Sequence, residues 1–558
     1  MREELETGEV DRDAGGVALP DNIAFVAVPA LALAACGSGG SPTPAPTPTP
    51  TPTPTGATPP QAARFLAQAT MGSSSADIAH VQAIGFDGWL TEQFAKPRAT
   101  THWDWLIANG YNDVANINSQ KGYDPTVWRQ LITSDDQLRQ RVAMALLDFL
   151  VVGIDGLTTN WKAFAAAAFL DVLTDNAFGN YRALIDAVSL NPAMGLYLTF
   201  LGNRKANAAT GAVPDENYAR ELMQLFTLGL VQLNMDGTPK SGSPDTYTQD
   251  DVTGLARVFT GFTYASSDGS VPDRLRVPMI QNASLHETGT KVFLGTTIPA
   301  GTDGFASLKL ALDSIFAHAN VPPFISKQLI QRLVTSNPTP AYVGRVAAVF
   351  ADNGSGVRGD LKAVVRAILL DSEARDDTIA TGVSFGKLRE PIMRLTNWAR
   401  AFGVTSASNA WAIGDTSSSG TRLAESPGRS QSVFNFFRPG YTPPNTAIAA
   451  QGLVGPEFQI TNEPSVVAYL NYMQTLIASG TGDVKANYTD ILAKAADSQA
   501  LIDAVNLTVA AGQVSAATLA TVKAAVDSIS ATGTNGPINR VYTAILLVMA
   551  TPEYIAQK

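Results

Sequence analysis

The amino-acid sequence predicts a mainly α-helical protein, a large multi-helix domain with a short β-hairpin excursion near residues 275–300. Apolar residues recur at three- and four-residue spacing through most of the chain after Gln61, which is the period of helices with one buried face. Several of these segments begin with helix-capping residues. Hydrophobic residues make up 45% of the 558 residues and charged residues 16%, so the chain can fill a large core.

Nine segments carry the helical period clearly. Two of them have strong start signals, because Thr248 precedes Asp251 at capping-box spacing and Asp360 stands where an N-cap belongs. The segments predicted to be helical are 135–151, 161–173, 181–188, 215–228, 249–260, 305–316, 342–350, 361–370 and 391–402.

The clearest strand candidate is the segment 291–298, Lys-Val-Phe-Leu-Gly-Thr-Thr-Ile, which is rich in β-branched residues. Together with residues 276–289 before it, this segment predicts a short hairpin or an extended excursion inside the helical body. Residues 403–430 are rich in Ser, Gly and Thr and predict an irregular loop. Residues 480–535 are rich in Ala and predict a peripheral pair of helices.

The N-terminus carries an apolar run, residues 23–35, that leads into Leu-Ala-Ala-Cys at 33–36. This sequence resembles a bacterial lipoprotein signal, in which the Cys is acylated and becomes the mature N-terminus. The run has the length of a signal segment rather than of a membrane span, although residues 1–13 are acidic where such signals are basic. The resemblance implies lipidation of Cys36. Since Gly37 rather than Asp follows, it implies an outer-membrane lipoprotein that faces the periplasm or the cell surface.

Cys36 is the only cysteine, so its acylation leaves no thiol for a disulfide, a metal site or a nucleophile. Residues 41–60 form a Pro–Thr-rich segment that favours polyproline II and cannot fill a core. At about 3.1 Å per residue, residues 36–60 would hold the folded body on the order of 75 Å from the lipid. The predicted organisation is a signal-type segment (1–35), a lipidated Cys and Pro/Thr-rich stalk (36–60), a main helical domain (61–402), the irregular loop (403–430) and a C-terminal helical part packing on the main domain (431–558).

Charge and motif content exclude several classes of function. The formal net charge is −10, so we expect no nucleic-acid partner, which would need a basic surface. The four histidines show no metal-binding spacing, and no GxSxG elbow, Walker loop or dinucleotide fingerprint stands out, so we expect no metal and no cofactor. The segment 352–360 departs from a calcium-loop pattern and predicts a turn followed by an N-cap.

The segment 214–230 reads PDENYARELMQLFTLGL and carries a polar cluster at its start. On a helical wheel, Glu216 and Arg220 form a surface pair opposite the apolar stripe. Asn217 and Glu221 instead lie at the border of that stripe. Glu221 is therefore a structural carboxylate bonded to a neighbouring helix, a group in a functional cleft, or an exposed residue.

The remaining candidates for chemistry are carboxylates and one histidine. His286 stands in the non-helical excursion with Lys291 five residues further on, and a loop histidine is either a hydrogen-bonding residue or a catalytic one. Five of the seven tryptophans lie between residues 89 and 161, where they serve the core or stack on sugars. The candidate catalytic residues are Glu221 and His286, and the candidate binding residues are Asn217, Arg220, Asp250, Arg257 and Lys291.

Several stretches in order resemble a known bacterial family. They are RFLAQATMG (64–72), NPAMGLYL (191–198), the segment 214–230, YTQDDVTGLARVFTGF (247–262), HETGTKVFLG (286–295), AILLDSEAR (367–375), SVFNFFRPGYTPP (432–444) and GPEFQI (455–460). Together they are similar to the family known as domain of unknown function 1800. The resemblance implies an exported protein, paired with a second exported family of sulfatase-like fold, the domain of unknown function 1501.

Two classes of function remain open from the sequence. The first is a lipid-anchored binding or assembly factor for an exported partner, such as the sulfatase-like protein, or for an envelope polymer. The second is a hydrolase- or lyase-like enzyme that acts on extracellular polysaccharide and uses Glu221 and His286 as acid and base. The sequence favours the first, because most of its polar residues stand at capping positions.

Overall fold

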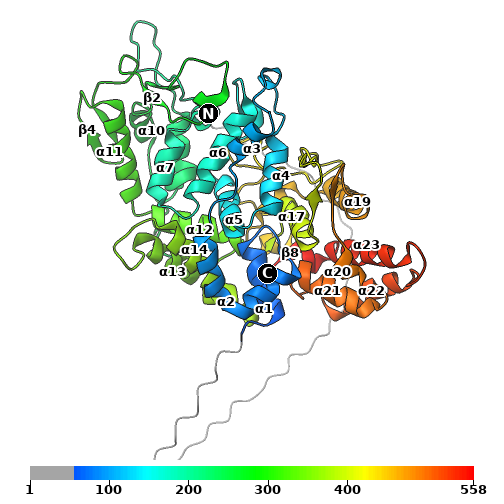
Figure 1. Cartoon of the computed structure of the whole chain (residues 1–558). Helices are drawn as coiled ribbons and strands as arrows, with labels where there is room; N and C mark the ends of the chain where they lie inside the picture. Colours follow the sequence, from blue (N-terminus) through cyan, green and yellow to red (C-terminus); the bar gives the residue numbers. More distant parts are fainter. Residues whose placement is uncertain (1–55) are drawn as a thin grey trace, which may run out of the picture. The chain divides into compact units, whose positions relative to one another are not determined.

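The structure, a computed structural model, describes residues 56–558. The predicted signal-type segment, the predicted lipidation at Cys36 and the predicted stalk up to residue 55 lie outside the described residues. Residues 56–558 form one compact unit built mostly from helices, which confirms the predicted fold class (Figure 1). Among these helices, none combines the length and the apolar character needed to cross a membrane.

The first part of this unit is a helical bundle. Its elements are α1 (Pro59–Ala69), α2 (Ser75–Ala95), α3 (His102–Ala108), η1 (Val114–Asn116), α4 (Tyr123–Thr133), α5 (Gln137–Leu147), η2 (Ile154–Gly156), α6 (Lys162–Asn176), α7 (Tyr181–Ser189) and α8 (Pro192–Tyr197). Helix α6 lies at the centre, against α3, α4, α5, α7 and α8. Residues 163–170 of α6 are Ala, Phe or Leu and all are buried, as expected for a helix that is apolar on every side.

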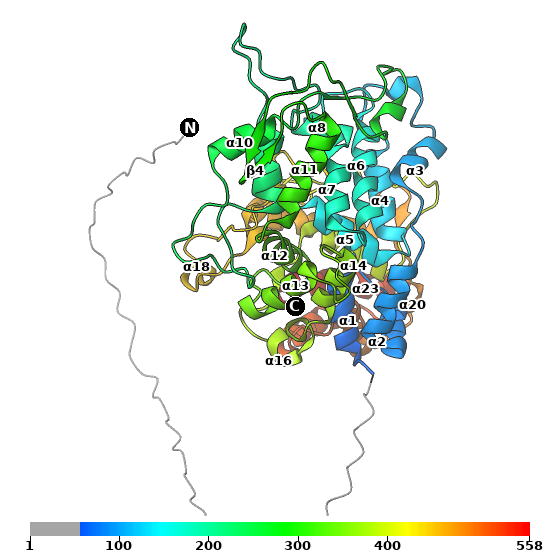
Figure 2. The same ribbon diagram turned by 90° about the vertical axis from the view of Figure 1, so that its left-hand side faces the viewer.

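The middle of the chain adds a second layer of helices and the short strands. Its elements are α9 (Asn217–Glu221), η3 (Leu222–Thr227), α10 (Gln249–Ala256), β1 (Phe262–Thr263), η4 (Pro272–Leu275), β2 (Ile280–Gln281), β3 (Lys291–Phe293), β4 (Thr296–Ile298), α11 (Gly304–Ala317), α12 (Val321–Leu333), α13 (Pro340–Ala351), α14 (Leu361–Leu370), α15 (Ser372–Arg375) and α16 (Asp377–Ala380). Helix α12 packs on α13 and α5, and α14 joins this layer to α1 and α2. In both views α10, α11 and β4 lie at one end of the unit and α1 and α2 at the other (Figure 2).

The last part of the chain returns to the first helices. Its elements are β5 (Lys387–Leu388), α17 (Pro391–Ala401), β6 (Thr405–Ser406), α18 (Ala447–Ala450), η5 (Pro456–Ile460), α19 (Glu463–Ser479), β7 (Val484–Lys485), α20 (Thr489–Leu492), α21 (Ser498–Ala510), α22 (Ala516–Asp527), α23 (Gly536–Met549), α24 (Pro552–Ile555) and β8 (Ala556–Gln557). Helix α21 packs on α1, α17 and α23, and β8 pairs antiparallel with β5. The last strand of the chain is thereby fixed beside residues 387–388.

Eight of the nine helices predicted from the apolar period form where expected, with shifts at their ends, and the ninth, predicted over 215–228, is divided between α9 and η3. Helix α14 has the predicted bounds, and α1 begins at Pro59, shortly before the expected start of the folded body at 61. Thr58 caps α1 in a capping box with Gln61, and Thr248 forms the predicted capping box with Asp251. Residues 403–430 hold the strand β6 and otherwise turns and bends, and residues 423–430 are buried.

The predicted excursion is a hairpin, but both of its strands lie within the segment 291–298. Leu294 and Gly295 adopt positive φ angles of 47° and 72°, as a two-residue hairpin turn requires. Residues 276–289 instead supply β2, which pairs with β1. The carboxylate of Asp251 accepts the amide of Leu294 at 2.6 Å and so fixes the hairpin to the start of α10.

Gly254 permits the close approach of α10 to this hairpin. A Cβ atom at Gly254 would lie 1.7 Å from the carbonyl oxygen of Val292, so the two backbones are in direct contact. A Cβ atom added at Gly344, inside α13, would not clash, because its nearest neighbour would be Asp236 at 3.6 Å.

We therefore expect Gly254→Ala to displace the hairpin and to lower the free energy of unfolding by about 1–3 kcal/mol. Gly344→Ala should leave stability unchanged or raise it by up to about 1 kcal/mol, since Ala favours a helix over Gly. Thermal unfolding followed by circular dichroism measures both variants. Equal melting temperatures for the two would contradict the close packing of α10 on β3.

Candidate functional site

The segment 214–230 is not the single α-helix that its apolar period predicts. Helix α9 passes at Leu222 into η3, which is a π-helix. Accordingly, the amide of Leu228 donates to the carbonyl of Met223 at 2.8 Å, five residues back. A wheel of 100° per residue therefore describes α9 but not the residues after Glu221, and π-helical turns of this kind are frequent at functional sites.

The polar residues of α9 mainly join it to α10. Arg220 lies 3.2 Å from the carboxylate of Glu216, which confirms the predicted surface pair. Gln249 and Thr253 of α10 also donate to Glu216, at 2.7 Å each. Asn217 is half-buried and donates to the hydroxyl of Thr199 at 3.4 Å.

The carboxylate of Glu221 is buried, with 8% of the residue exposed. Its Oε2 atom has no hydrogen-bond partner within residues 56–558. Burial raises the pKa of Glu221, and the nearby charge of Arg220 opposes the shift only in part. Glu221 is thus at the border position that the wheel predicts, without the bond to a neighbouring helix that a purely structural carboxylate would make.

His286 is buried beside Thr260, which follows the end of α10. Its Nδ1–H donates to the carbonyl of Thr260 at 2.8 Å, which leaves Nε2 with a lone pair and no partner in the described part of the chain. Burial lowers the pKa of His286, so the imidazole is neutral at pH 7. The hydroxyl of Thr260 accepts the amide of Glu287 at 2.8 Å and holds this turn in place.

Lys291 and Arg257 are near His286. Lys291 is fully buried, and its Nζ atom has no hydrogen-bond partner among the residues described. Burial lowers the pKa of Lys291, and the charge of Lys291 in turn lowers the pKa of His286. Arg257 donates to the carbonyl of Thr290 at 3.5 Å, and Asp250 is exposed on the first turn of α10. The structure places Asn217, Arg220 and Glu221 on α9. His286 lies beside Thr260 and Arg257 beside Thr290, and Lys291 lies in β3, which packs on α10.

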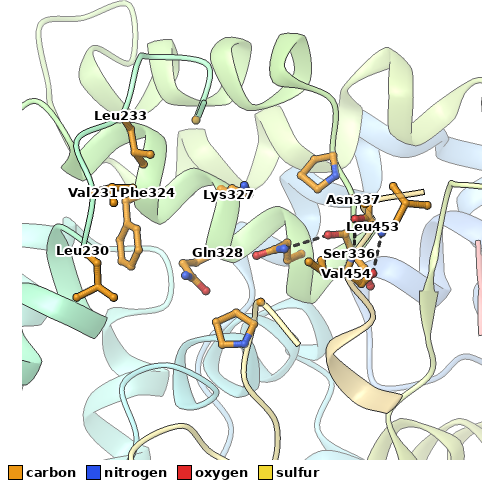
Figure 3. Close-up of a pocket in the computed structure, with 17 residues that line it drawn as sticks. Leu230, Val231, Leu233, Phe324, Lys327, Gln328, Ser336, Asn337, Leu453 and Val454 are labelled. Atoms are coloured by element: carbon orange, nitrogen blue, oxygen red, sulfur yellow. Dashed lines mark hydrogen bonds between the residues drawn. The ribbon is translucent and has the colours of Figure 1, made fainter. Parts of the chain in front are cut away.

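A groove that the sequence did not indicate lies over α12 (Figure 3). It has a volume of about 480 Å³, and one face of α12 forms its floor with Phe324, Lys327, Gln328 and Gln331. These positions are three or four residues apart and so share one side of the helix. The walls are residues 229–231, 233 and 237, residues 336–338, the Pro439–Gly440 turn and residues 452–454. We call this the α12 groove.

Two buried or half-buried asparagines hold the irregular walls of the α12 groove. Asn320 accepts the amide of Leu233 at 2.9 Å and donates to the carbonyls of Leu228 and Val231 at 3.0 and 2.8 Å. Asn337 donates to the carbonyl of Val454 and accepts its amide, both at 2.9 Å. Each side chain replaces the backbone partner that a loop lacks, so the walls keep a fixed shape without regular structure.

The α12 groove continues into a second pocket of about 170 Å³, with which it shares residues 336–337 and 453–454. Residues 383–388 and the end of β8 line this second pocket. Of the residues that line the two pockets in the described chain, none is Asp, Glu or His. The surface offers amides, apolar side chains, backbone groups and lysines.

A buried ionic cluster stands behind the second pocket. Its centre is Lys387, whose Nζ lies 2.6 Å from Glu390 and 3.0 Å from Glu457 and donates to the carbonyl of Arg332 at 3.0 Å. Burial opposes the charge of Lys387, yet the two carboxylates raise its pKa overall. The members of the buried ionic cluster are Arg141, Asp148, Arg332, Lys387, Glu390, Glu425 and Glu457.

Two acids of this cluster favour their protonated forms. Burial and the charge of Glu390 raise the pKa of Asp148 to about 7, although Arg332 lies 3.8 Å away. Burial and Glu390 also raise the pKa of Glu425 well above its ordinary value. The cluster therefore contains more carboxyl groups than its cations can keep ionised at neutral pH.

The groove and the cluster are built from stretches that are far apart in the sequence. Gly229 and Leu230 end the segment 214–230, Pro439 and Gly440 belong to 432–444, and Glu457 belongs to 455–460. A model of the protein family described as "Protein of unknown function (DUF1800)" matches residues 64–556, nearly the whole chain. The chain belongs to the DUF1800 family. Searches of the curated proteins and of the solved structures find no match.

In this DUF1800 protein, sequence reasoning found the polar residues at the start of the segment 214–230 but missed the wall residues at its end. Gly229 could have been noticed in the sequence as a glycine that ends a helical pattern. In the structure it has a φ of 76°, and a Cβ there would lie 2.7 Å from the ring of Phe324. Asn320 and Asn337 gave no signal, because a lone Asn is ordinary in a loop. The DUF1800 fold also brings no group of three or more His, Cys, Asp or Glu into a metal-binding arrangement within residues 56–558.

The raised pKa of Asp148 predicts a pH-dependent stability. The unfolded chain loses this proton near pH 3.8 and the folded chain near pH 7, so between these values the folded state binds more protons. The free energy of unfolding should therefore fall as pH rises from about 4 to 7, by on the order of 2–4 kcal/mol from this group. Asp148→Asn should reduce this slope, as measured by urea unfolding at several pH values.

Asp186→Asn provides the control, because Asp186 pairs with Arg182 at 3.3 Å on the surface. This variant should retain the wild-type slope between pH 4 and 7. A wild-type slope in Asp148→Asn would show that Asp148 does not hold a proton in the folded protein.

Proposed function

We propose that the protein is a lipid-anchored envelope protein that binds an extended segment of an exported polypeptide partner in the α12 groove. The observation that carries this proposal is the groove itself, with its amide-lined floor and walls fixed by Asn320 and Asn337. A groove of about 480 Å³ has the size of a specific binding site. Its rigid walls support binding, because a preorganised site loses little entropy when a ligand enters.

The composition of the groove favours a polypeptide over a sugar polymer. Gln328 and Gln331 carry amides, which match the donors and acceptors of a peptide backbone. Leu230 and Phe324 provide apolar surface for side chains, and Leu230 is 59% exposed. The resemblance to the family suggests the exported sulfatase-like protein as the partner, and an envelope polymer is the alternative occupant.

A hydrolase- or lyase-like activity with Glu221 and His286 remains a second proposal with less support. Acid–base catalysis needs both groups at the substrate, whereas both residues are buried and neither lines the α12 groove. The unpartnered atoms of Glu221 and His286 favour this reading, since such groups are often found at reactive sites.

The proposed position at the membrane rests on the Leu-Ala-Ala-Cys sequence and on the Pro–Thr-rich segment after it. The folded unit begins at residue 56 and its first helix, α1, at Pro59, so the Pro–Thr-rich segment 41–60 runs into that helix. A tether of this kind would keep the groove within reach of other envelope proteins and raise its effective concentration there.

We expect Leu230→Asp to weaken partner binding about tenfold, because a carboxylate would have to be desolvated in the bound groove. Binding is measured by co-purification with the co-expressed sulfatase-like protein, and by photo-crosslinking from a reactive residue placed at 230. Crosslinks to a polypeptide at this position support the proposal.

Val213→Asp is the matched control, since Val213 is also an exposed aliphatic residue, at 77% exposure, but does not line the groove. This variant should bind the partner like the wild type, and both variants should keep the wild-type melting temperature. Equal binding by Leu230→Asp and wild type would contradict a role for the groove.

Cys36→Ser tests the anchor. It should abolish the incorporation of labelled palmitate and move the protein from the membrane to the soluble fraction, because acylation needs the thiol. Ser41→Ala leaves the cysteine intact and should behave like the wild type. Retention of Cys36→Ser in the membrane fraction, without label in either protein, would contradict lipidation at this residue.

A further inference from the structure

Lys327 places a positive charge in the middle of the α12 groove. Figure 3 shows its side chain on the groove floor, between Phe324 toward one end and Asn337 toward the other. The residue is half-buried, and its Nζ atom forms no hydrogen bond or ion pair within residues 56–558. Unlike the Nζ atom of Lys291, that of Lys327 is not sealed from solvent. The groove therefore presents an ammonium group that a ligand can reach.

The other lysines that line the α12 groove and the second pocket already have partners. Lys387 pairs with two carboxylates of the buried ionic cluster. The Nζ atom of Lys558 donates to the carbonyls of Gly382 and Phe385 at 2.9 and 2.7 Å. Among the lysines of these two pockets in the described chain, Lys327 is thus the one that is left for a ligand.

The surroundings of Lys327 provide no counter-charge. Burial lowers its pKa, and no charged group of the described residues opposes this shift. The lining of the groove in residues 56–558 contains no Asp or Glu. The carboxylate of Asp236, beside the wall residue Gly237, instead accepts the hydroxyl and the amide of Thr238 at 2.6 and 3.0 Å. Because an ammonium group loses part of its hydration here, a carboxylate that enters the groove would stabilise it.

Gln328, the next residue on the floor, offers a donor beside this charge. Its Oε1 atom accepts from Arg332 at 2.5 Å, which directs the amide NH₂ group away from that contact. This NH₂ group has no partner in the described structure and keeps accessible surface. It can therefore donate to a backbone carbonyl of a bound polypeptide. The charge at Lys327 and the donor at Gln328 lie side by side on one face of α12.

The position of Lys327 along the groove favours an acidic side chain over a chain end. The groove continues past Asn337 into the second pocket, and Leu230 and Phe324 provide apolar surface on the other side of Lys327 (Figure 3). A polypeptide that fills the groove therefore has chain on both sides of the ammonium group. The carboxylate that meets it then belongs to an Asp or Glu within the segment.

We infer that the α12 groove selects an extended polypeptide segment with an acidic side chain, whose carboxylate pairs with Lys327. Gln328 donates to the backbone of the same segment, and the apolar residues at the ends of the groove hold its neighbouring side chains. An ion pair in a partly desolvated groove gives specificity, because a neutral or basic side chain at the same place leaves the ammonium group without a partner. This inference rests on the proposed binding function and adds the chemistry that the groove requires of its partner.

The inference is tested by selection from a random heptapeptide library displayed on phage, with the full-length protein and its Lys327→Glu variant in detergent. Each peptide is joined to the phage coat protein through its C-terminus, so only side chains offer carboxylates. The wild type should enrich Asp and Glu at least about threefold over the unselected library, and Lys327→Glu should enrich Lys and Arg instead. Selected peptides that crosslink at position 230 without acidic enrichment would overturn the inference and leave the proposed function standing. Failure to select any peptide that crosslinks there would overturn both.

Fluorescence anisotropy with a selected acidic peptide locates the contact. Replacing its acidic residue by the corresponding amide should weaken binding to the wild type about tenfold, since a charge-assisted hydrogen bond is lost. Lys327→Met should bind both peptides alike, within about twofold, and Lys327→Arg, which keeps the charge, should retain the preference. Lys494→Met is the matched control, because Lys494 also forms no ion pair in the described chain but does not line the α12 groove. This control should keep the tenfold preference. An equal preference in Lys327→Met and wild type would overturn the pairing with Lys327.

Discussion

The buried ammonium group of Lys387 connects the parts of the protein that form the groove. An ion of this kind costs several kcal/mol to bury unless charged and polar partners surround it. Glu390 and Glu457 supply the charges, and the carbonyl of Arg332 supplies a third acceptor. Glu390 is the N-cap residue of α17, Glu457 lies in η5 and Arg332 lies in α12. These three elements must therefore lie together for Lys387 to have its hydrogen-bond and charge partners. The second pocket and the far wall of the α12 groove lie directly beside this point.

The groove walls show how irregular segments become rigid enough to bind. Leu230 in the first wall and Gln232 beside it form backbone hydrogen bonds with Thr246 and Pro244. The amides of Asn320 and Asn337 add the partners that Val231 and Val454 still need. Gly229 lets the first wall lie against Phe324, where any side chain would collide. The walls thus depend on backbone hydrogen bonds together with single asparagine side chains, whereas the floor depends on the regular spacing of α12. This arrangement favours binding, because the groove walls have their shape before a partner arrives.

The candidate residues taken from the sequence occupy a different environment from the one expected of an open acid–base site. Glu221 lies where α9 changes into a π-helix, His286 bonds to Thr260 after the end of α10, and Lys291 lies in β3, which packs on α10. All three are buried with a polar atom that the described residues leave unpartnered. Burial sets the direction of each pKa shift, which is upward for the carboxylic acid and downward for the two bases.

The sequence by itself determined the helical fold and most helix positions, because these follow from the local period of apolar residues. It also determined the capping box at Thr248, which is a local hydrogen-bond pattern, and the family, which follows from stretches of adjacent residues. It also located the hairpin, although not its turn at Leu294 and Gly295. Only the tertiary structure decided where the binding surfaces lie. The α12 groove and the ionic cluster around Lys387 each join residues that are far apart in the chain. Whether their polar groups are buried, and whether those groups have hydrogen-bond partners, depends on tertiary packing. A local sequence pattern does not contain this information.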